Sequence, residues 1–306
     1  MRVTHLFCAF LLASGLSASH GQSIAVTHQN RERTYLLHAP AASSPLPLVL
    51  VFHGGSDTPQ NMETISGFSL LAEREHFIVA YPAGIDKSWN DGRGSTPAAK
   101  TSIDDVGFTG AVIADIQRRY PIDTRRIYAT GPSNGGIFVL RLACEMADTF
   151  AAVGPVIGAL ATELKPRCKP AFPISIVGIA GVADPLIPFA GGEEGGEKHL
   201  GHGGRVEGAR ATQDFFASLE GCSSAVTEQL SSSANDGTSV SRRSYSNCRA
   251  GTAVVWYEIA GGGHRWHGHE ARPFAERAIQ RALGVSSRNI DTTQVLWEFF
   301  RAHPRP

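Results

Sequence analysis

Apolar segments that alternate with amphipathic segments constrain the fold of this chain more than any other feature. The apolar segments have the length of buried strands, and several end in glycine: 45–55, 77–84, 125–131, 151–158, 172–181 and 253–263, with an alternating strand pattern at 33–40. Helical spacing marks other segments: 64–76, 102–120, 137–147, 208–219 and 292–303. Strands that are apolar on both faces are typical of a parallel sheet covered on both sides. The sequence therefore predicts an α/β fold, with a mostly parallel central sheet and helices on both faces.

The chain is expected to form a single domain. Its 306 residues suit one large α/β domain or two small ones. The glycine-rich segment 190–204 and the serine-rich segment 230–241 could be linkers, but strand patterns resume after each. We interpret both as surface loops within one domain that covers residues 22–306.

The first residues have the pattern of a secretory signal peptide. Arg2 precedes the apolar segment 6–19, which gives way to small and polar residues. This segment is shorter than the run of about 20 apolar residues that a spanning helix needs. Cys8 lies inside it without a small-residue lead-in, which argues against a lipid anchor. We expect a signal peptide at 1–21 and a protein secreted to the periplasm or the exterior.

Export changes how the cysteines are interpreted, because disulfides persist in oxidising compartments. Removal of the signal peptide leaves Cys144, Cys168, Cys222 and Cys248, and no CxxC spacing suggests zinc. Four cysteines allow three pairings. We favour Cys144–Cys168 and Cys222–Cys248, each of which closes a local loop, and four buried free thiols are the alternative.

The charge balance restricts the partners. Lys and Arg together number 28, as do Asp and Glu, so the formal net charge is zero. A nucleic acid or an anionic membrane surface would favour a basic excess. We expect neither as a partner, and the sequence leaves the oligomeric state open.

A serine lies at a sharp glycine-flanked turn, in the sequence Gly131-Pro132-Ser133-Asn134-Gly135. This is the G-x-S-x-G pattern of a nucleophile elbow, and here it follows a predicted strand and opens a predicted helix. The tight turn exposes the serine hydroxyl only if its neighbours lack bulky side chains. The pattern predicts a nucleophilic serine, whereas a simple helix-capping turn is the alternative.

A serine nucleophile needs a general base and an acid that orients the base. In this architecture the acid and then the base should follow later strands. Asp184 and His264 lie directly after two predicted strands, so we expect them to fill these roles. His267 and His269 are rival bases, and the three histidines could also bind a metal. No carboxylate or cysteine joins them at ligand spacing, so we expect no metal and no cofactor.

The oxyanion of an acyl-transfer reaction needs hydrogen-bond donors. One should be the backbone N–H of Asn134, the residue after the nucleophile. The other should come from the turn after an early strand, where His53, Gly54 and Gly55 lie. An ordinary strand-ending turn is the alternative at this position.

Several motifs together resemble the secreted polyhydroxybutyrate depolymerase and feruloyl esterase type C group of α/β-hydrolases, which is similar to carbohydrate esterase family 1 and to acetylxylan esterases. They are "FHGG", "SWNDGR", "DDVGF", "RRIYATGPSNGG", "RLACE", "ADPLIP" and "GGGHRWHG", between Arg33 and His303. The resemblance implies that Ser133 is the nucleophile, Asp184 the acid and His264 the base.

The resemblance also implies roles for residues around the triad. Gly54 and Asn134 would form the oxyanion hole, and both favoured disulfides fit the group. The expected substrate contacts are His53, Trp89, Asn90 and Trp266. Asp104 and Asp105 match the group's motif as well, but we assign them to the N-terminus of a helix that Ser102 could cap.

The sequence departs from the group's pattern near each triad member. Pro132 replaces the usual Met or Leu before the nucleophile. Ala180 and Val182 replace a histidine and a threonine before the acid, and Arg265 and His267 replace a threonine and a proline after the base. All triad residue types remain, so these departures should affect substrate preference.

The sequence predicts a secreted serine carboxylesterase that forms an acyl-enzyme. Its expected substrates are feruloyl or acetyl esters of plant polysaccharide such as xylan, and a hydroxyalkanoate polyester is the alternative. We favour the phenolic esters because no separate polymer-binding module is visible. A catalytically silent glycan- or polyester-binding protein and an acyltransferase are the other hypotheses.

Overall fold

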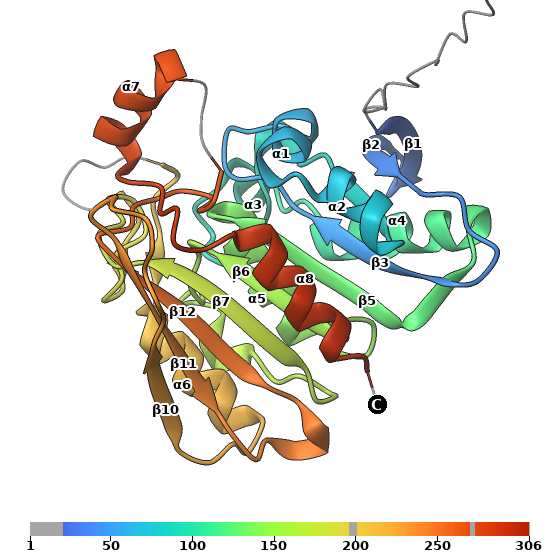
Figure 1. Ribbon diagram of the computed structural model, residues 1–306. Helices are drawn as coiled ribbons and strands as arrows, with labels where there is room; N and C mark the ends of the chain where they lie inside the picture. Colours follow the sequence, from blue (N-terminus) through green and yellow to red (C-terminus); the bar gives the residue numbers. More distant parts are fainter. Residues whose placement is uncertain (1–20, 196–200, 270–272, 306) are drawn as a thin grey trace, which may run out of the picture.

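A sheet of ten strands runs through the residues that the computed structural model describes, 21–195, 201–269 and 273–305 (Figure 1). The strand order is β1-β2-β4-β3-β5-β6-β7-β12-β11-β10. The central strands are parallel: β4 (Ile78–Pro82), β3 (Leu46–Val51), β5 (Ile122–Pro132), β6 (Ala152–Val156), β7 (Ser175–Gly181) and β12 (Val254–Ala260). The prediction of a mostly parallel central sheet is confirmed.

Both edges of the sheet are antiparallel, and the sequence analysis missed most of their strands. β1 (Gln22–His28) and β2 (Arg31–His38) form one edge, while β11 (Ser239–Tyr245) and β10 (Ala225–Gln229) form the other. β10 is exposed along nearly its whole length, so its residues do not alternate between polar and apolar. β11 begins at Ser239, so the prediction of a loop over 230–241 was wrong for its last three residues.

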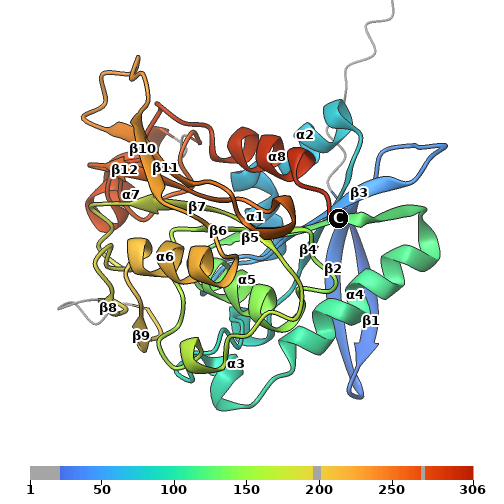
Figure 2. The same cartoon turned by 90° about the horizontal axis from the view of Figure 1, so that it is seen from below.

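Helices cover both faces of the sheet (Figure 2). One face carries α4 (Asp105–Arg119), α5 (Asn134–Glu145) and α6 (Ala209–Leu219), and the other carries α1 (Pro59–Ser66), α2 (Phe68–Glu75) and α8 (Thr292–Ala302). Each face has its own apolar core. Phe108, Phe138 and Phe216 are fully buried in the first, and Trp297 and Phe300 belong to the second. The sheet is therefore anchored on both sides.

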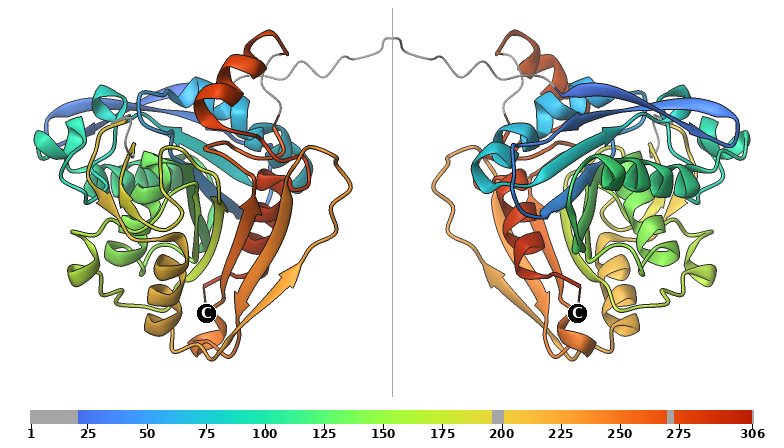
Figure 3. Two further views of the ribbon diagram at one scale, coloured as in Figure 1. Left: turned by 90° about the vertical axis from the view of Figure 1, so that its left-hand side faces the viewer. Right: turned by 90° about the vertical axis from the view of Figure 1, so that its right-hand side faces the viewer.

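Short elements decorate the edge of the sheet at which the parallel strands end. The sequence analysis did not identify α3 (Pro97–Lys100), the hairpin of β8 (Gly192–Glu193) and β9 (Arg205–Val206), or α7 (Pro273–Leu283). Single turns of 3-10 helix also occur in the connections between elements: η1 (Ile85–Lys87), η2 (Lys165–Arg167) and η4 (Arg249–Gly251), which precedes β12. α7 projects from the molecule (Figure 3), and its end returns to the loop after β12.

Two helix boundaries differ from the predicted ones for local reasons. The helical pattern over 64–76 is divided at Gly67, whose φ of 64° places it in the left-handed region and ends α1. The predicted cap at Ser102 was wrong, because Asp104 is the N-cap of α4. Its carboxylate Oδ1 accepts a hydrogen bond of 2.8 Å from the backbone N–H of Gly107.

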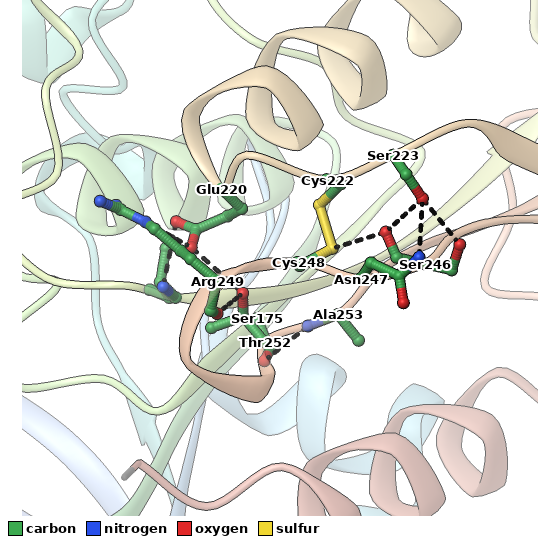
Figure 4. Close-up of a disulfide and its surroundings, with 11 residues drawn as sticks. Ser175, Glu220, Cys222, Ser223, Ser246, Asn247, Cys248, Arg249, Thr252 and Ala253 are labelled. Atoms are coloured by element: carbon green, nitrogen blue, oxygen red, sulfur yellow. Dashed lines mark hydrogen bonds and ion pairs between the residues drawn. A yellow bond between two sulfur atoms is a disulfide. The ribbon is translucent and has the colours of Figure 1, made fainter.

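Disulfides join Cys144 to Cys168 and Cys222 to Cys248. The first ties the end of α5 to the segment after η2. The second ties the residues after α6 to the loop before β12 (Figure 4). Beside it, the buried carboxylate of Glu220 accepts hydrogen bonds from several groups: the backbone N–H of Ile174, Nε of Arg249 and the hydroxyl of Thr252. The Cys222–Cys248 disulfide and the hydrogen bonds of Glu220 therefore stabilise the same part of the fold.

Reduction of the disulfides is expected to lower the melting temperature by several degrees. Each bridge closes a loop of 24 or 26 residues, which corresponds to about 3 kcal/mol on the chain-entropy account. The measurement is thermal unfolding with and without dithiothreitol, with free thiols counted by mass spectrometry. An unchanged melting temperature in fully reduced protein would contradict the expectation.

The predicted signal peptide at 1–21 lies almost wholly outside the described residues. Across 21–195, 201–269 and 273–305, no helix combines the length and apolar character that a membrane span requires.

Candidate active site

The carboxyl ends of β3, β5, β7 and β12 bring the predicted site residues to one edge of the sheet. These strands all belong to the parallel part of the sheet, so their ends face the same way. Gly54 follows β3, Ser133 follows β5, Asp184 follows β7 and His264 follows β12. Functional groups of parallel α/β sheets collect at this edge.

Ser133 lies at a strained turn between β5 and α5. Its φ of 56° and ψ of −124° are unusual for a residue with a side chain. The flanking glycines make the turn possible, because a Cβ on Gly131 or Gly135 would overlap the carbonyl oxygen of Phe52. The backbone N–H of Ser133 donates a hydrogen bond of 2.9 Å to the carbonyl of Val156, which fixes the turn against β6. This is the geometry expected of a nucleophile elbow.

Asp184 and His264 form a buried hydrogen-bonded pair. His264 Nδ1 lies 2.8 Å from Asp184 Oδ2, and the side chains are 8% and 2% exposed respectively. The other oxygen, Oδ1, accepts the backbone N–H groups of Leu186 and Ile187 at 2.8 and 2.9 Å. A carboxylate can only accept, so Nδ1 carries the proton, and Nε2 of the neutral ring keeps its lone pair. Such a ring can act as a general base.

Ser133 and His264 are placed at the same edge without a direct hydrogen bond between their side chains in the described part of the chain. The hydroxyl of Ser133 does not cap α5 either, and the residue is only half-buried. In enzymes without a bound substrate, such hydrogen bonds are often long and tighten later. The structure therefore joins two of the three expected triad members directly.

Gly54 and the start of α5 lie beside Ser133. A Cβ on Gly54 would be 3.6 Å from the Cβ of Ser133, so the loop after β3 contacts the elbow. The backbone N–H of Phe52 donates to the carbonyl of Thr130 at 2.8 Å and holds the two strands together. The first N–H groups of a helix have no intrahelical acceptor. The N–H of Asn134 is thus available beside Ser133.

The side chain of Asn134 bonds to Trp89 and Asp91 and thereby fixes the turn at Ser133. Its Oδ1 accepts the backbone N–H of Trp89 at 2.8 Å. Its Nδ2 donates to the carbonyl of Trp89 at 3.1 Å and to Oδ2 of Asp91 at 2.6 Å. These bonds position the backbone of Asn134 and leave only its N–H for the site.

Two of the four expected substrate contacts, His53 and Trp89, are buried beneath the site, which corrects the sequence-based assignment. His53 Nε2 accepts the backbone N–H of Gly84 at 3.0 Å, so Nδ1 donates to the carbonyl of Gly54 at 2.7 Å. Burial lowers the pKa of His53, which keeps the ring neutral. The indole N–H of Trp89 donates to the carbonyl of His53 at 2.8 Å, and its ring stacks on Phe138. Both residues support the Gly54 loop instead of facing a substrate.

Trp266 and Asn90, the other two expected substrate contacts, form hydrogen bonds to other residues of the protein. Trp266 is 6% exposed, and its indole N–H donates to the hydroxyl of Thr293 at 3.0 Å. Asn90 is half-buried, and its backbone N–H donates to Asp105 at 2.7 Å. Asp105 is itself buried in an ion pair of 2.8 Å with Arg33, so it does more than favour a helix N-terminus. Nδ2 of Asn90 also donates to the carbonyl of Ile103 at 3.0 Å, and contact of Trp266 or Asn90 with a substrate stays a prediction.

Sequence analysis missed a group of buried charges behind the site. Arg93 pairs with Asp91 and with Glu194, each at 2.7 Å, and all three side chains are at most 4% exposed. Glu194 comes from the glycine-rich segment that was interpreted as an ordinary surface loop. A single basic residue in a motif such as "SWNDGR" gives no sign of a partner about a hundred positions away. His202, in the same segment, was also missed, and it lies against Gly55.

His267 is not a rival base, because it is fully buried. Its Nδ1 accepts the backbone N–H of Ser287 at 3.0 Å. Burial, and then the charge of Arg265, lower the pKa of His267 to about 4. Among the described residues, no three or more histidine, cysteine or acidic side chains cluster as metal ligands would.

The buried imidazole of His267 is expected to make the protein less stable in acid. Its pKa is about 4 when folded and near 6.5 when unfolded. Between these values only the unfolded chain takes up the proton, so stability is lost as the pH falls from about 6.5 to about 4. The loss corresponds to roughly 3 kcal/mol. His267→Gln should weaken this dependence in urea unfolding at pH 7.5 and pH 4.5, and equal dependences for both proteins would contradict it.

Comparisons with known proteins agree with this geometry. The family model described as "Esterase PHB depolymerase" matches residues 33–169. "Putative esterase NocK" of Nocardia uniformis subsp. tsuyamanensis is 32% identical over 279 residues, which cover 85% of this chain and 79% of that protein. "Feruloyl esterase C" of Emericella nidulans is 28% identical over 285 residues, which cover 90% and 86% respectively.

A solved structure shares the fold. "Acetyl xylan esterase from Aspergillus awamori" matches with a TM-score of 0.57 and 14% identity, over 80% of this chain and 94% of that one. At this identity the likeness shows the α/β-hydrolase fold alone. Because the match to NocK extends over most of both proteins, the chain is an esterase and belongs to the family described by the PHB depolymerase esterase model.

Proposed function

We propose that this chain is a secreted serine esterase with Ser133 as nucleophile, His264 as general base and Asp184 as the acid that orients the base. The hydrogen bond between His264 and Asp184 carries the proposal, because it selects the tautomer whose Nε2 can accept a proton. The strained, glycine-flanked turn at Ser133 supports it, since such strain persists mainly at functional sites.

The reaction proceeds through an acyl-enzyme. Ser133 Oγ bonds to the ester carbonyl carbon while its proton moves to Nε2 of His264, and the carbonyl electron pair moves onto oxygen. The N–H groups of Gly54 and Asn134 donate to this oxyanion. The bond to the alcohol then breaks as His264 returns the proton to the leaving oxygen. A water molecule, deprotonated by His264, attacks the acyl-enzyme and releases the acid.

The substrates we propose are feruloyl or acetyl esters of plant polysaccharide such as xylan. The names of relatives support this class, since "Feruloyl esterase C" and "Feruloyl esterase B" of Piromyces equi are both similar to this chain. The match to the Piromyces equi protein covers only 39% of that protein. The description of the family model favours a second candidate, a hydroxyalkanoate polyester.

Export and a single catalytic domain complete the proposal. The signal peptide would occupy residues 1–21 and the domain residues 22–306. Two disulfides support an oxidising compartment. We propose no nucleic-acid or membrane partner.

The test compares methyl ferulate, acetylated xylan and poly(3-hydroxybutyrate) as substrates of the purified protein. A fluorophosphonate should label Ser133, as located by peptide mass spectrometry. Hydrolysis of methyl ferulate or acetylated xylan at the higher kcat/KM supports the polysaccharide esters, and release of hydroxybutyrate from the polymer supports the polyester. Product transesterified to an added alcohol would indicate acyl transfer. If no substrate is turned over and Ser133 is not labelled, the result would favour a catalytically silent glycan- or polyester-binding protein.

A further inference from the structure

The imidazole of His202 lies against the loop that carries the proposed oxyanion donor Gly54. A Cβ on Gly55 would lie 2.8 Å from Nε2 of His202 and 3.7 Å from the Cβ of Asn134. This imidazole and the side chain of Asn134 therefore both lie near the position that a Cβ on Gly55 would take. His202 is half-buried.

A side chain at position 55 would meet the imidazole of His202. Gly55 does not adopt the left-handed conformation that would require glycine. The nearest atoms that a Cβ would meet belong to the His202 ring, at 2.8 and 3.0 Å, which is closer than real Cβ atoms approach. The space beside the oxyanion loop is thus occupied by the imidazole of His202.

Hydrogen bonds and buried charges hold the backbone of His202 in place. Its N–H donates to Oε2 of Glu194 at 2.7 Å, and the same oxygen pairs with Nη1 of Arg93 at 2.7 Å. Arg93 also donates to the carbonyl of Gly203 at 3.1 Å. The backbone of Gly203 is therefore bonded directly to a fully buried guanidinium, and that of His202 is connected to it through Glu194.

The same guanidinium connects this segment to the nucleophile elbow. Nη2 of Arg93 pairs with Oδ2 of Asp91, which accepts Nδ2 of Asn134 at 2.6 Å. A continuous chain of buried polar contacts thus runs from the backbone of His202 to Asn134. Buried, fully bonded networks of this kind rigidify their surroundings. The backbone of His202 is therefore fixed relative to the site.

Neither ring nitrogen of His202 has a hydrogen-bonding partner within the described parts of the chain. His53, on the other side of the same loop, has both nitrogens bonded to backbone groups. An imidazole whose backbone is fixed and whose nitrogens have no partner in the protein can bond a molecule from outside it.

The strand order indicates which part of an ester would meet His202. Gly55 follows β3, which neighbours β5 on one side, whereas His264 follows β12, which lies beyond β5 on the other side. His264 must reach the leaving alcohol to protonate it. The acyl group, which does not face His264, would then extend past the oxyanion hole on the side of β3 and the Gly55 loop.

We infer that His202 determines specificity by forming a hydrogen bond to a hydroxyl group on the acyl part of the ester. The inference rests on the proposed function, because it needs the ester carbonyl at Gly54 and Asn134. Esters of hydroxylated acids, such as hydroxycinnamic or 3-hydroxyalkanoic acids, are then preferred to their unhydroxylated counterparts.

The test uses substrate pairs that differ in one hydroxyl: methyl 4-hydroxycinnamate with methyl cinnamate, and ethyl 3-hydroxybutyrate with ethyl butyrate. Wild type should prefer the hydroxylated member of at least one pair. His202→Ala should reduce that preference about fivefold, the effect of one net hydrogen bond. His202→Gln, which keeps a donor, should recover part of it. Arg205→Ala, an exposed change in β9, is the control and should keep the wild-type preference.

Equal losses for both members of a pair would show that His202 only supports the loop, and would overturn the inference. The absence of any preference in wild type would overturn it too. A binding measurement, which needs no turnover, distinguishes failure of this inference from failure of the proposed function. In protein labelled with ¹⁵N-histidine, at least one of 4-hydroxycinnamate and 3-hydroxybutyrate should shift the ring signals that His202→Ala removes, while cinnamate and butyrate should not. Unshifted signals would overturn the inference whatever the activity, whereas a shift in an inactive protein would contradict the proposed function alone.

Discussion

Ser133→Ala should abolish hydrolysis of p-nitrophenyl acetate, with kcat lower by about 10⁵- to 10⁶-fold. The variant has no hydroxyl to attack the carbonyl carbon, so no acyl-enzyme can form. Folding should be unaffected, because the Ser133 hydroxyl caps no helix and alanine keeps the same Cβ. Initial rates of nitrophenolate release, with circular dichroism and melting temperature as checks on folding, provide the measurement.

The control for this variant is Ser223→Ala. Ser223 is exposed beside the Cys222–Cys248 disulfide, where its hydroxyl bonds only to neighbouring loop residues (Figure 4). Its kcat should equal that of wild type. If Ser133→Ala kept more than about a thousandth of the activity, another nucleophile would have to be found.

The elbow and the order of the site residues could be predicted because their signals are local. The glycines around Ser133 are adjacent in sequence, and steric crowding at a tight turn needs no long-range information. Asp184 and His264 each follow a strongly apolar strand, and a parallel sheet brings such positions to one edge. Their contact follows from topology, and topology follows from the pattern of apolar segments.

The direction of each side chain could not be predicted in the same way. His53 and Trp89 have the residue types of a substrate site, yet both rings turn inward and bond backbone groups. Nothing in their sequence neighbourhood distinguishes the two orientations, because the deciding partners come from other elements. The edge strand β10 escaped prediction for a different reason: its pairing with β11 needs no buried face.

The buried Arg93 network shows why a glycine-rich segment was misjudged. Low apolar content at 190–204 predicts a solvent-exposed loop, since loops of this composition rarely bury side chains. Glu194 is nevertheless 4% exposed, because the cation on Arg93 compensates for its desolvation. Pairing between distant charges leaves no periodic pattern in either segment. Structure alone reveals that this segment supports the site.

Arg93→Met should destabilise the protein by about 3–5 kcal/mol, because it leaves the buried carboxylates of Asp91 and Glu194 without their cation. Activity of the protein that remains folded should fall as well, since Asp91 also holds the side chain of Asn134. Urea unfolding gives the free energy, and kcat measured well below the melting temperature gives the activity.

Two further variants decide whether buried charge is the cause. Arg118 is 66% exposed and pairs with Asp115, which keeps its ion pair with Arg119, so Arg118→Met should cost less than about 1 kcal/mol. Adding Asp91→Asn and Glu194→Gln to Arg93→Met removes the unpaired charges and should restore part of the lost stability. If Arg93→Met cost no more than Arg118→Met, or if neutralising both carboxylates restored nothing, unpaired buried charge would not explain the loss. The segment at 201–206 would then have to be held at the site by its other contacts, such as the hydrogen bond of 2.7 Å from the hydroxyl of Ser95 to the carbonyl of Gly203.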